Sequence, residues 1–316
     1  MTTVSKDHAL KGVLIAFASF AAYAFSDASV KLLEGTLSPY QASFLGAIFG
    51  AMALPFIMKP GDRWTDVFAT TNRPLWILRF AAQAGGTIGS VTAFTHLSMA
   101  EAFALIFLLP SFVTIMSVVF LKEQVGFRRW GAVIIGFVGV MIVLRPGFRE
   151  LSIGHLGAVF GGLSGAISIV IFRAMGPSEK NISLYGAGVL GTLVVCGALA
   201  IPGFQVPTAM QWVWLAGYGG FAAIAAILLM YAAAYAPATL IGPTQYSQML
   251  WAVLFGYLVF GDHIDLPMMI GILLIVGSGL LTLVRERVRG TPLPPSIGTD
   301  AQAAAMVSPE EPTEQK

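Results

Sequence analysis

Amide, indole and phenol side chains gather within one apolar stretch near the carboxyl end of the chain. Gln245 precedes Gln248 by three residues, and Trp251 follows Gln248 by three more. Side chains three or four residues apart lie on one face of a helix, so we expect two amides and an indole to point together. Such a face suits a flat, hydrogen-bonding, uncharged ligand; hydrogen bonding between helices around buried aromatic rings is the alternative. The other candidate ligand-binding residues are Tyr246, Ser111, Gln83, Thr87, Tyr231 and Tyr235.

Charged groups and prolines inside apolar runs form a second set of candidates. Asp27 and Lys31 are one helical turn apart. One alternative is that they form an ion pair with a purely structural role, which we call a clip, and the other is that Asp27 takes part in proton coupling. His96 and Glu101 flank a tight turn, where Glu101 equally suits a helix N-terminus because the helix dipole favours negative charge there. Prolines free backbone carbonyls and permit kinks that act as gates. The coupling or gating candidates are therefore Asp27, Lys31, His96, Glu101, Pro110 and Pro243.

The composition of the whole chain excludes a water-soluble protein. Of its 316 residues, 56% are hydrophobic and only 11% are charged, whereas a soluble domain carries about 25% charged residues. The net charge of +2 is too small to indicate a nucleic-acid partner, and the single cysteine allows no internal disulfide. The four histidines have no metal-ligand spacing, and no phosphate-binding glycine motif occurs, so we expect no metal and no cofactor.

Apolar runs of membrane-spanning length recur along most of the chain. Backbone groups in a bilayer must be satisfied internally, so each run is predicted to be a helix, which makes an all-α membrane protein with ten transmembrane helices. Residues 285–316, rich in Pro, Ala, Ser and Glu, are predicted to be a disordered tail. The predicted spans cover residues 10–33, 39–58, 75–97, 101–121, 128–145, 155–173, 182–201, 211–235, 237–260 and 266–284.

Three details of these spans predict their surroundings. Gly157, Gly161 and Gly165 are spaced by four and form a flat strip that another helix can approach. Arg79, about one turn inside the third span, is expected to snorkel to the membrane surface. Thirteen Lys and Arg residues fall on the side of the N-terminus and three on the other side, so both termini are predicted to be cytoplasmic.

The chain repeats itself, which determines the functional interpretation. One constant shift along the chain pairs Gly131, Ile135, Gly139 and Arg145 with Gly271, Ile275, Gly279 and Arg285. Residues 10–145 and 155–284 are thus predicted to be two homologous halves. Five spans in each half make the second half inverted relative to the first, which is typical of alternating-access carriers with a central substrate site. A channel or a lipid-modifying membrane enzyme has no need for this symmetry, and dispersed histidines also disfavour an enzyme.

The first copy, AEAFALIFLLPSFVTIMSVVFLKEQVGFRRWGAVIIGFVGVMIVLRPG, resembles the EamA-type repeat of the drug/metabolite transporter superfamily. Its characteristic features are the mid-helix proline, an acidic residue at the end of the fourth span, and regularly spaced glycines in the fifth span. The second copy, IGPTQYSQMLWAVLFGYLVFGDHIDLPMMIGILLIVGSGLLTL, is similar to the second repeat of that family. Within it, the chain looks most like bacterial riboflavin importers and also resembles S-adenosylmethionine uptake carriers. Many relatives have an arginine in the second span, where this chain reads QASFLGAIFG, so any role of that arginine does not transfer.

We therefore predict a secondary transporter, not an enzyme, in the inner membrane of a bacterium. It would move a small organic metabolite, such as riboflavin or another heteroaromatic, between two inverted five-helix repeats. Export of amino acids or drug-like metabolites is the alternative within the same superfamily. The predicted partners are a small-molecule substrate and the lipid bilayer, without nucleic acid. A homodimer is also compatible with the sequence.

Overall fold

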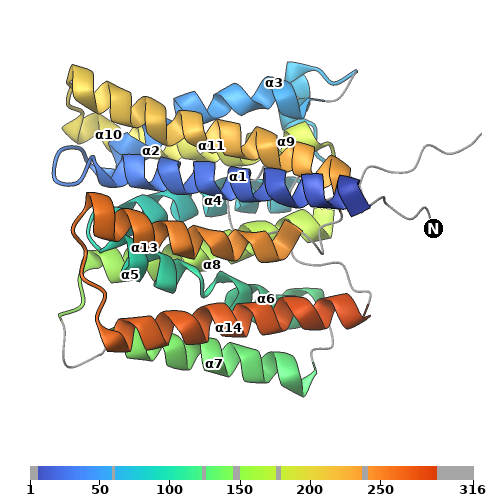
Figure 1. Ribbon diagram of the computed structural model, residues 1–316. Helices are drawn as coiled ribbons and strands as arrows, with labels where there is room; N and C mark the ends of the chain where they lie inside the picture. The colour runs from blue at the N-terminus through green and yellow to red at the C-terminus, as the bar shows by residue number, and fades with distance from the viewer. Residues whose placement is uncertain are drawn as a thin grey trace, which may run out of the picture.

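The computed structural model describes residues 6–58, 61–122, 126–144, 150–175, 179–236 and 241–289. Every regular element in these ranges is helical, and the long helices run side by side in one bundle (Figure 1). Among the described residues, six helical stretches are long and apolar enough to cross a membrane, and two shorter apolar helices accompany them. The prediction of an all-helical membrane protein is confirmed, whereas the number of ten spans and their inverted repeat stay predictions.

Helices in the first half begin where short polar residues bind free backbone N–H groups. Ser38, Asn72 and Ser98 each accept a hydrogen bond from a backbone N–H three residues later, which satisfies donors that the first helical turn leaves open. The elements are α1 (Lys6–Lys31), α2 (Pro39–Gly50), η1 (Ala51–Ala53), α3 (Leu54–Ile57), η2 (Trp64–Phe68), α4 (Arg73–Phe94), α5 (Met99–Ile106), α6 (Leu109–Leu121) and α7 (Phe127–Leu144).

Helices in the second half follow the same order of long and interrupted segments. Thr208 and Gln211 form a reciprocal cap at the start of α11. Helix α14 continues through Arg289, because Arg and Glu are good helix formers, so the prediction of a disordered tail is wrong for residues 285–289. The rest of that predicted tail lies outside the described residues. The elements are α8 (Ile153–Met175), α9 (Asn181–Gly191), the π-helical η4 (Thr192–Cys196), α10 (Gly197–Ala200), η5 (Ile201–Gly203), α11 (Ala209–Tyr235), η6 (Gly242–Tyr246), α13 (Ser247–Val259) and α14 (Leu266–Arg289).

A proline lies in the first turn of a helical segment in each half. The chain leaves α5 at Ile106 and starts α6 at Leu109, with Pro110 in the first turn of the new helix. Pro243 likewise lies in the first turn of η6, ahead of α13. Proline has no N–H to donate, so it is tolerated where the first turn leaves donors unbonded anyway. The predicted kink position at Pro110 therefore coincides with a break between two helices, whereas residues 237–240, which precede the Pro243 segment, lie outside the described residues.

Small residues set the closest helix contacts. Helix α4 packs on α8, where a Cβ on Gly89 would lie 2.6 Å from the carbonyl oxygen of Gly157. Gly161 faces the backbone of α4 as well, whereas Gly165 lies against Leu109 of α6. The predicted glycine strip is thus confirmed as a contact surface, for two helices rather than one. Side chains at these positions would push the helix axes apart.

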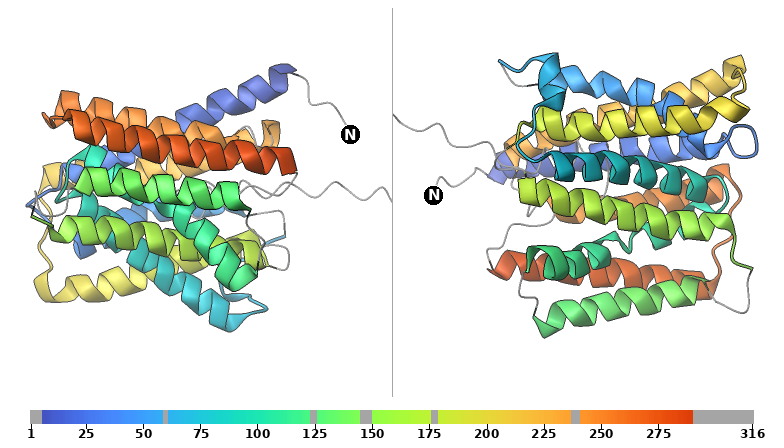
Figure 2. Two further views of the ribbon diagram at one scale, coloured as in Figure 1. Left: turned by 90° about the horizontal axis from the view of Figure 1, so that it is seen from below. Right: turned by 180° about the vertical axis from the view of Figure 1, so that it is seen from behind.

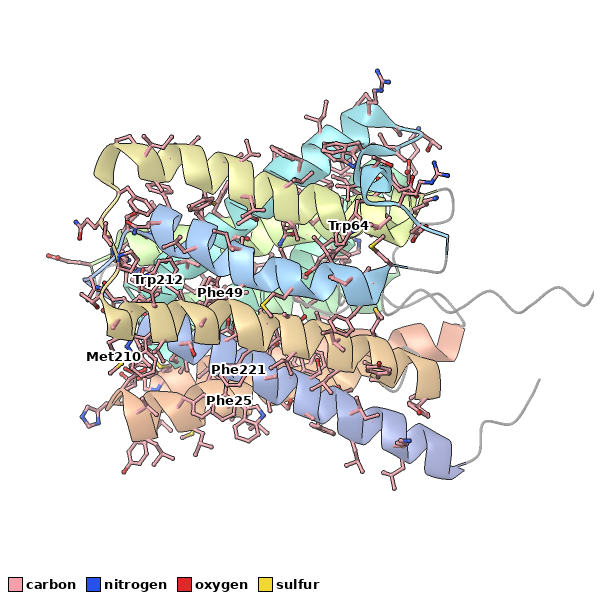
Figure 3. The ribbon with its side chains drawn as sticks, turned by 90° about the horizontal axis from the view of Figure 1, so that it is seen from above. Phe25, Phe49, Trp64, Met210, Trp212 and Phe221 are labelled. Carbon is pink, nitrogen blue, oxygen red and sulfur yellow. The ribbon has the colours of Figure 1, made fainter. Side chains whose placement is uncertain are left out.

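Two further helix pairs complete the arrangement. Helices α7 and α14 pair along one side of the bundle in both Figure 1 and Figure 2. Helix α1 pairs with α11. Phe25 stacks on Phe221 across this pair, with ring centroids 5.5 Å apart (Figure 3). Phe49 and Trp212 make an edge contact between α2 and α11 at 6.4 Å.

The two ends of the bundle are distinguished by the connections that they carry. The N-terminus, η2 and the start of α9 lie at one end, which we call the N-terminal end (Figure 1). The turns between α1 and α2, between α4 and α5, and between α13 and α14 lie at the opposite end (Figures 1 and 2).

Candidate functional site

A cavity of about 220 Å³ lies among the helices, roughly midway between the two ends. Helices from both halves of the chain form its walls, whereas α7 and α14 contribute none of the described lining residues. Its apolar walls include Phe94, Phe103, Ile106 and Leu109. Its polar lining consists of Asp27, three tyrosines (Tyr23, Tyr185 and Tyr218), two glutamines (Gln83 and Gln248) and hydroxyl groups of Ser26, Ser43, Thr87, Ser90 and Thr192.

Part of the lining occupies matching positions in the two halves. The four lining residues of α2 have the same spacing as the four from α9 and η4, so one constant shift along the chain relates every pair. The same shift relates Tyr23 of α1 to Gly165 of α8, and both of these residues line the cavity. The matching pairs from α2 are Ser43 with Tyr185, Gly46 with Gly188, Ala47 with Val189, and Gly50 with Thr192.

Four of the residues selected from the sequence meet at this cavity: Asp27, Gln83, Thr87 and Gln248. The hydroxyl oxygens of Thr87 and Thr192 lie 3.4 Å apart across it. Gln248 is 5% exposed, and within the described residues no hydrogen bond reaches its amide or that of Gln83. Buried amides without partners cost free energy. Both amides are therefore available to a ligand in the cavity.

The other aromatic and amide candidates lie outside the described lining. Trp251 stacks on Phe255, with ring centroids 5.8 Å apart, so it does not share the environment of Gln248. Tyr246 is buried against Phe107 at 5.6 Å. Gln245 is buried next to it, and its Nε2 atom has no partner within the described part of the chain.

The remaining substrate candidates lie on other surfaces. Ser111 is buried where α6 approaches α7, since a Cβ on Gly136 would lie 3.1 Å from its hydroxyl oxygen. Tyr231 is 54% exposed on the outside of α11. Tyr235 lies under the ammonium group of Lys11, 4.4 Å from the ring centroid, where a cation–π contact forms.

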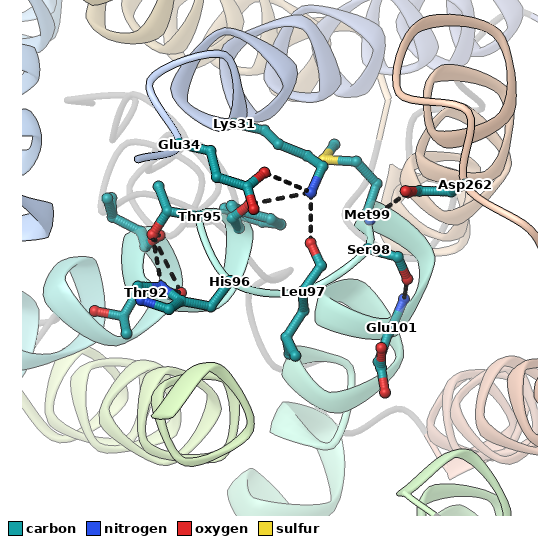
Figure 4. A network of polar contacts seen from close by, with 12 residues as sticks. Lys31, Glu34, Thr92, Thr95, His96, Leu97, Ser98, Met99, Glu101 and Asp262 are labelled. Carbon is teal, nitrogen blue, oxygen red and sulfur yellow. Dashed lines mark hydrogen bonds and ion pairs between the residues drawn. The ribbon is translucent and has the colours of Figure 1, made fainter. Parts of the chain in front are cut away.

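Lys31 does not form an ion pair with Asp27, so the predicted clip is not present. Its buried ammonium group instead donates a 2.6 Å hydrogen bond to the carbonyl oxygen of Leu97 and pairs with Glu34 at 3.4 Å (Figure 4). The long side chain of Lys31 reaches past its own helix to the turn between α4 and α5, where unbonded carbonyls attract a cation. His96 lies in the same turn with an exposed side chain, and its Nδ1 atom is 2.9 Å from the carbonyl oxygen of Thr92.

Glu101 and His155 form a buried pair at the opposite end, with 3.2 Å between Oε1 and Nε2. The backbone N–H of Ser152 donates to Nδ1 of His155 at 2.9 Å, so Nδ1 is unprotonated and Nε2 carries the hydrogen that Glu101 accepts. Glu101 thus joins α5 to α8. Asp262 joins α5 to the turn after α13, because its Oδ2 atom accepts the N–H of Met99 at 2.9 Å (Figure 4).

The snorkelling expected of Arg79 is wrong. Its side chain is fully buried, and it donates to the carbonyl oxygens of Leu184 at 2.7 Å and Ser168 at 2.8 Å. These bonds tie α4 to α9 and α8. Sequence alone could not reveal acceptors that lie on other helices, so the guanidinium was expected to seek water.

Several cavity residues were missed by reasoning from the sequence, notably Ser43, Tyr185 and Tyr218. Gly46 lies against the Tyr218 ring, where any side chain would overlap it. The hydroxyl of Ser26 donates to the carbonyl oxygen of Tyr218 at 2.6 Å, which joins α1 to α11. The available signal was the spacing shared by the second and seventh apolar runs, which could have been aligned with each other.

An all-helical bundle with several stretches long and apolar enough to cross a membrane, and with a polar cavity among its helices, is the architecture expected of a membrane transport protein. The chain belongs to the EamA-like transporter family, because the model of that family matches it twice, over residues 10–145 and 152–284. The family predicted from the sequence is confirmed, and the chain is a multi-pass membrane transporter of a small molecule. The relatives described in the next paragraph are transporters, which agrees with the prediction that the chain is not an enzyme.

The named relatives fall into two groups. An S-adenosylmethionine uptake transporter of Rickettsia bellii (strain RML369-C) is 25% identical over 264 residues, covering 83% of this chain and 89% of the relative. A riboflavin transporter of Vibrio cholerae serotype O1 is 30% identical over 162 residues, covering 51% and 54%. A riboflavin transporter of Brucella anthropi is 26% identical over 241 residues, covering 74% and 84%. A solved crystal structure shares the fold over 90% of this chain and 100% of its own, with a TM-score of 0.59 and 16% identity.

Proposed function

We propose that this protein is a secondary carrier that moves a small organic metabolite across the bacterial inner membrane by alternating access through the central cavity. The observation that carries the proposal is the set of lining residues that recur at matching positions of the two halves. A cavity built from matching positions of two repeats is the expected site of a carrier whose halves rock against each other. The distribution of basic residues supports a cytoplasmic location for both termini.

The helix contacts support the inverted repeat. If α1, α4 and α7 of the first half correspond to α8, α11 and α14 of the second, exchanging the halves turns the α1–α11 contact into the α8–α4 contact. The same exchange returns the α7–α14 contact to itself. Contacts that exchange in this way follow from two halves related by a pseudo-two-fold axis. Each interface then has a counterpart at which the halves could rearrange.

The substrate proposed from the relatives is a heteroaromatic metabolite with several hydrogen-bonding groups. S-adenosylmethionine and riboflavin, the compounds in the relatives' names, both fit that description. The amides of Gln83 and Gln248 and the hydroxyl groups around them match the edges of such rings. The cavity of about 220 Å³ is smaller than the roughly 300–1,000 Å³ typical of drug-sized ligands, so the helices must separate to admit the substrate.

Transport by cells that express the chain tests this proposal. Uptake and efflux of radiolabelled S-adenosylmethionine and riboflavin are measured for the wild type, Gln248→Ala and Gln245→Ala. We expect Gln248→Ala to raise the half-saturation concentration about five- to a hundredfold, because a ligand loses one buried amide partner. Gln245→Ala is the matched control, since Gln245 is an equally buried amide three residues away that does not line the cavity.

Two results would contradict the proposal. If Gln245→Ala impairs transport as much as Gln248→Ala at equal expression, the cavity is not the binding site. If neither direction of transport is detected for any member of a wider metabolite panel, the carrier function itself fails. The sign of the flux decides between uptake and the alternative of export.

A further inference from the structure

Asp27 is the one carboxyl group in the described lining of the cavity. It lies on α1, one turn after Tyr23 on the same face. No hydrogen bond or ion pair to another described residue reaches its carboxyl group. Lys31, one turn further on, has turned toward the carbonyl oxygen of Leu97 and toward Glu34.

No basic side chain of the described residues lines the cavity to balance this carboxyl group. Arg79 lies one turn before Gln83 on α4, but its guanidinium is committed to the carbonyl oxygens of Leu184 and Ser168. His155 is committed to Glu101 at the opposite end. A carboxylate removed from bulk water is costly unless a cation or hydrogen-bond donors compensate it. A positively charged ligand would supply that compensation.

The aromatic part of the lining suits the same kind of ligand. Tyr23, Tyr185 and Tyr218 all line the cavity, and they come from α1, α9 and α11. Aromatic faces attract ammonium and other onium groups through the ring quadrupole, most strongly where water is excluded. A carboxyl group that lines the same cavity as three tyrosines therefore favours a cation over a neutral group of the same shape.

The second half offers no counterpart to this carboxyl group. Under the shift that relates Tyr23 to Gly165, Asp27 corresponds to Ile169, which is buried where α8 meets α6. Helix α8 contains no Asp or Glu. The acidic group is thus an addition to the repeat rather than a part of its shared design, as expected of a residue that selects the ligand.

We propose that Asp27 binds a sulfonium group of the transported metabolite, and that the cavity therefore selects a sulfonium compound over its uncharged thioether of nearly the same size. This inference rests on the proposed function, because it takes the cavity as the transport site. It distinguishes the two groups of relatives, since S-adenosylmethionine carries a sulfonium and riboflavin carries no positive charge.

Binding of two compounds to the purified full chain tests the proposal. S-adenosylmethionine and S-adenosylhomocysteine differ by one methyl group and one positive charge on sulfur. We expect the wild type to bind the sulfonium compound at least about tenfold more tightly, and Asp27→Asn to bring the two affinities together. Asp27→Glu keeps the preference, and Asp66→Asn, which removes a carboxyl group outside the cavity, leaves it unchanged. Equal affinities in the wild type, or an unchanged preference in Asp27→Asn, would overturn the proposal.

A second measurement needs no substrate. A cysteine is placed in the cavity by Thr87→Cys in a chain that also carries Cys196→Ala. Its reaction rates with two methanethiosulfonate reagents are then compared. One reagent carries a positively charged trimethylammonium group, and the other carries a negatively charged sulfonate group. We expect Asp27→Asn to lower the cation-to-anion rate ratio at least about tenfold. An unchanged ratio would overturn the proposal, whereas a lowered ratio without any transport would mean that the proposed function fails and the cation site stands.

Discussion

Each end of the bundle carries a contact between the two halves, and the two contacts lie at corresponding places but differ in chemistry. At the opposite end, the start of α2 is bound to the segment before α11, because the Gln41 amide donates to the carbonyl oxygen of Gln205 at 2.5 Å and accepts its N–H at 3.1 Å. At the N-terminal end, the start of α9 is bound to η2, where Lys180 reaches Asp66 at 2.6 Å and Asp62 at 3.3 Å. Under the proposed repeat these two contacts are equivalent.

Burial separates the two contacts. Gln41 is 1% exposed, and the nearby Glu101–His155 pair is buried as well. The side chain of Lys180 is 48% exposed. Exposed ion pairs contribute little and are screened by salt, whereas breaking a buried polar contact leaves unsatisfied groups behind. Of these two contacts, the exposed ion pair of Lys180 is therefore expected to cost less to break than the buried contact of Gln41.

The largest effect on stability is expected from the Glu101–His155 pair. Glu101→Ala should lower the free energy of unfolding by about 1.5–3 kcal/mol, because the buried Nε2–H of His155 loses a charged acceptor. Thermal unfolding of the purified protein measures the change, and a double-mutant cycle with His155→Ala isolates the pair. A coupling energy near zero would mean that the two side chains do not hold α5 against α8.

Removing the Gln41 amide should have a somewhat smaller effect, about 1–2 kcal/mol for Gln41→Ala. Gln205→Ala is the matched control, because Gln205 takes part only through its backbone and both hydrogen bonds would survive. Unfolding midpoints of the two variants measure their losses of stability. Equal losses in both would contradict the assignment of the stabilisation to the two hydrogen bonds between the Gln41 amide and the Gln205 backbone.

The positions of the helices followed from hydropathy, because an apolar backbone in a membrane has few alternatives to a helix. Asp27, Gln83, Thr87 and Gln248 were found because polar groups inside spans are rare and expensive. The direction in which each side chain points was harder to predict. A step of three residues falls short of a full helical turn, and this offset is enough to turn Trp251 toward Phe255 while Gln248 lines the cavity.

Other misses had a different cause. Ser43 and Tyr185 lie in spans that are apolar on every side, so no amphipathic pattern indicated their inward face. Lys31 and Arg79 are bonded to carbonyl oxygens on other helices. Backbone acceptors leave no trace in side-chain composition, so only the three-dimensional arrangement could reveal them.

The smallest effect is expected at the N-terminal end, where the ion pair depends on pH and salt. The hydrogen bond from Lys180, followed by the one from the Arg63 N–H, holds the pKa of Asp66 below its ordinary value of 3.8. The hydrogen bond to Asp66 raises the pKa of Lys180 above 10.5. A lowered carboxyl pKa stabilises the folded state above pH 3.8 and loses that effect as pH falls. A raised ammonium pKa stabilises it below pH 10.5 and loses that effect as pH rises.

The stability difference between wild type and Asp66→Asn should therefore be constant between about pH 5 and pH 9, shrink below pH 3.8, and decrease with added salt. Unfolding midpoints at low and high salt across this range measure it. A difference that persists at acidic pH, or that grows with salt, would show that the pair does not stabilise this end.

The central claim, that the two ends open in turn onto one cavity, is tested most directly by labelling a cavity cysteine from each face of the membrane. Thr87→Cys in a chain carrying Cys196→Ala is exposed to an impermeant maleimide in right-side-out and in inverted vesicles. We expect labelling from both faces. Crosslinked cysteines at Asp66 and Lys180 should abolish labelling from the face of the N-terminal end only, and crosslinked cysteines at Gln41 and Gln205 should abolish it from the other face only. Labelling from a single face, or from both faces despite either crosslink, would contradict alternating access.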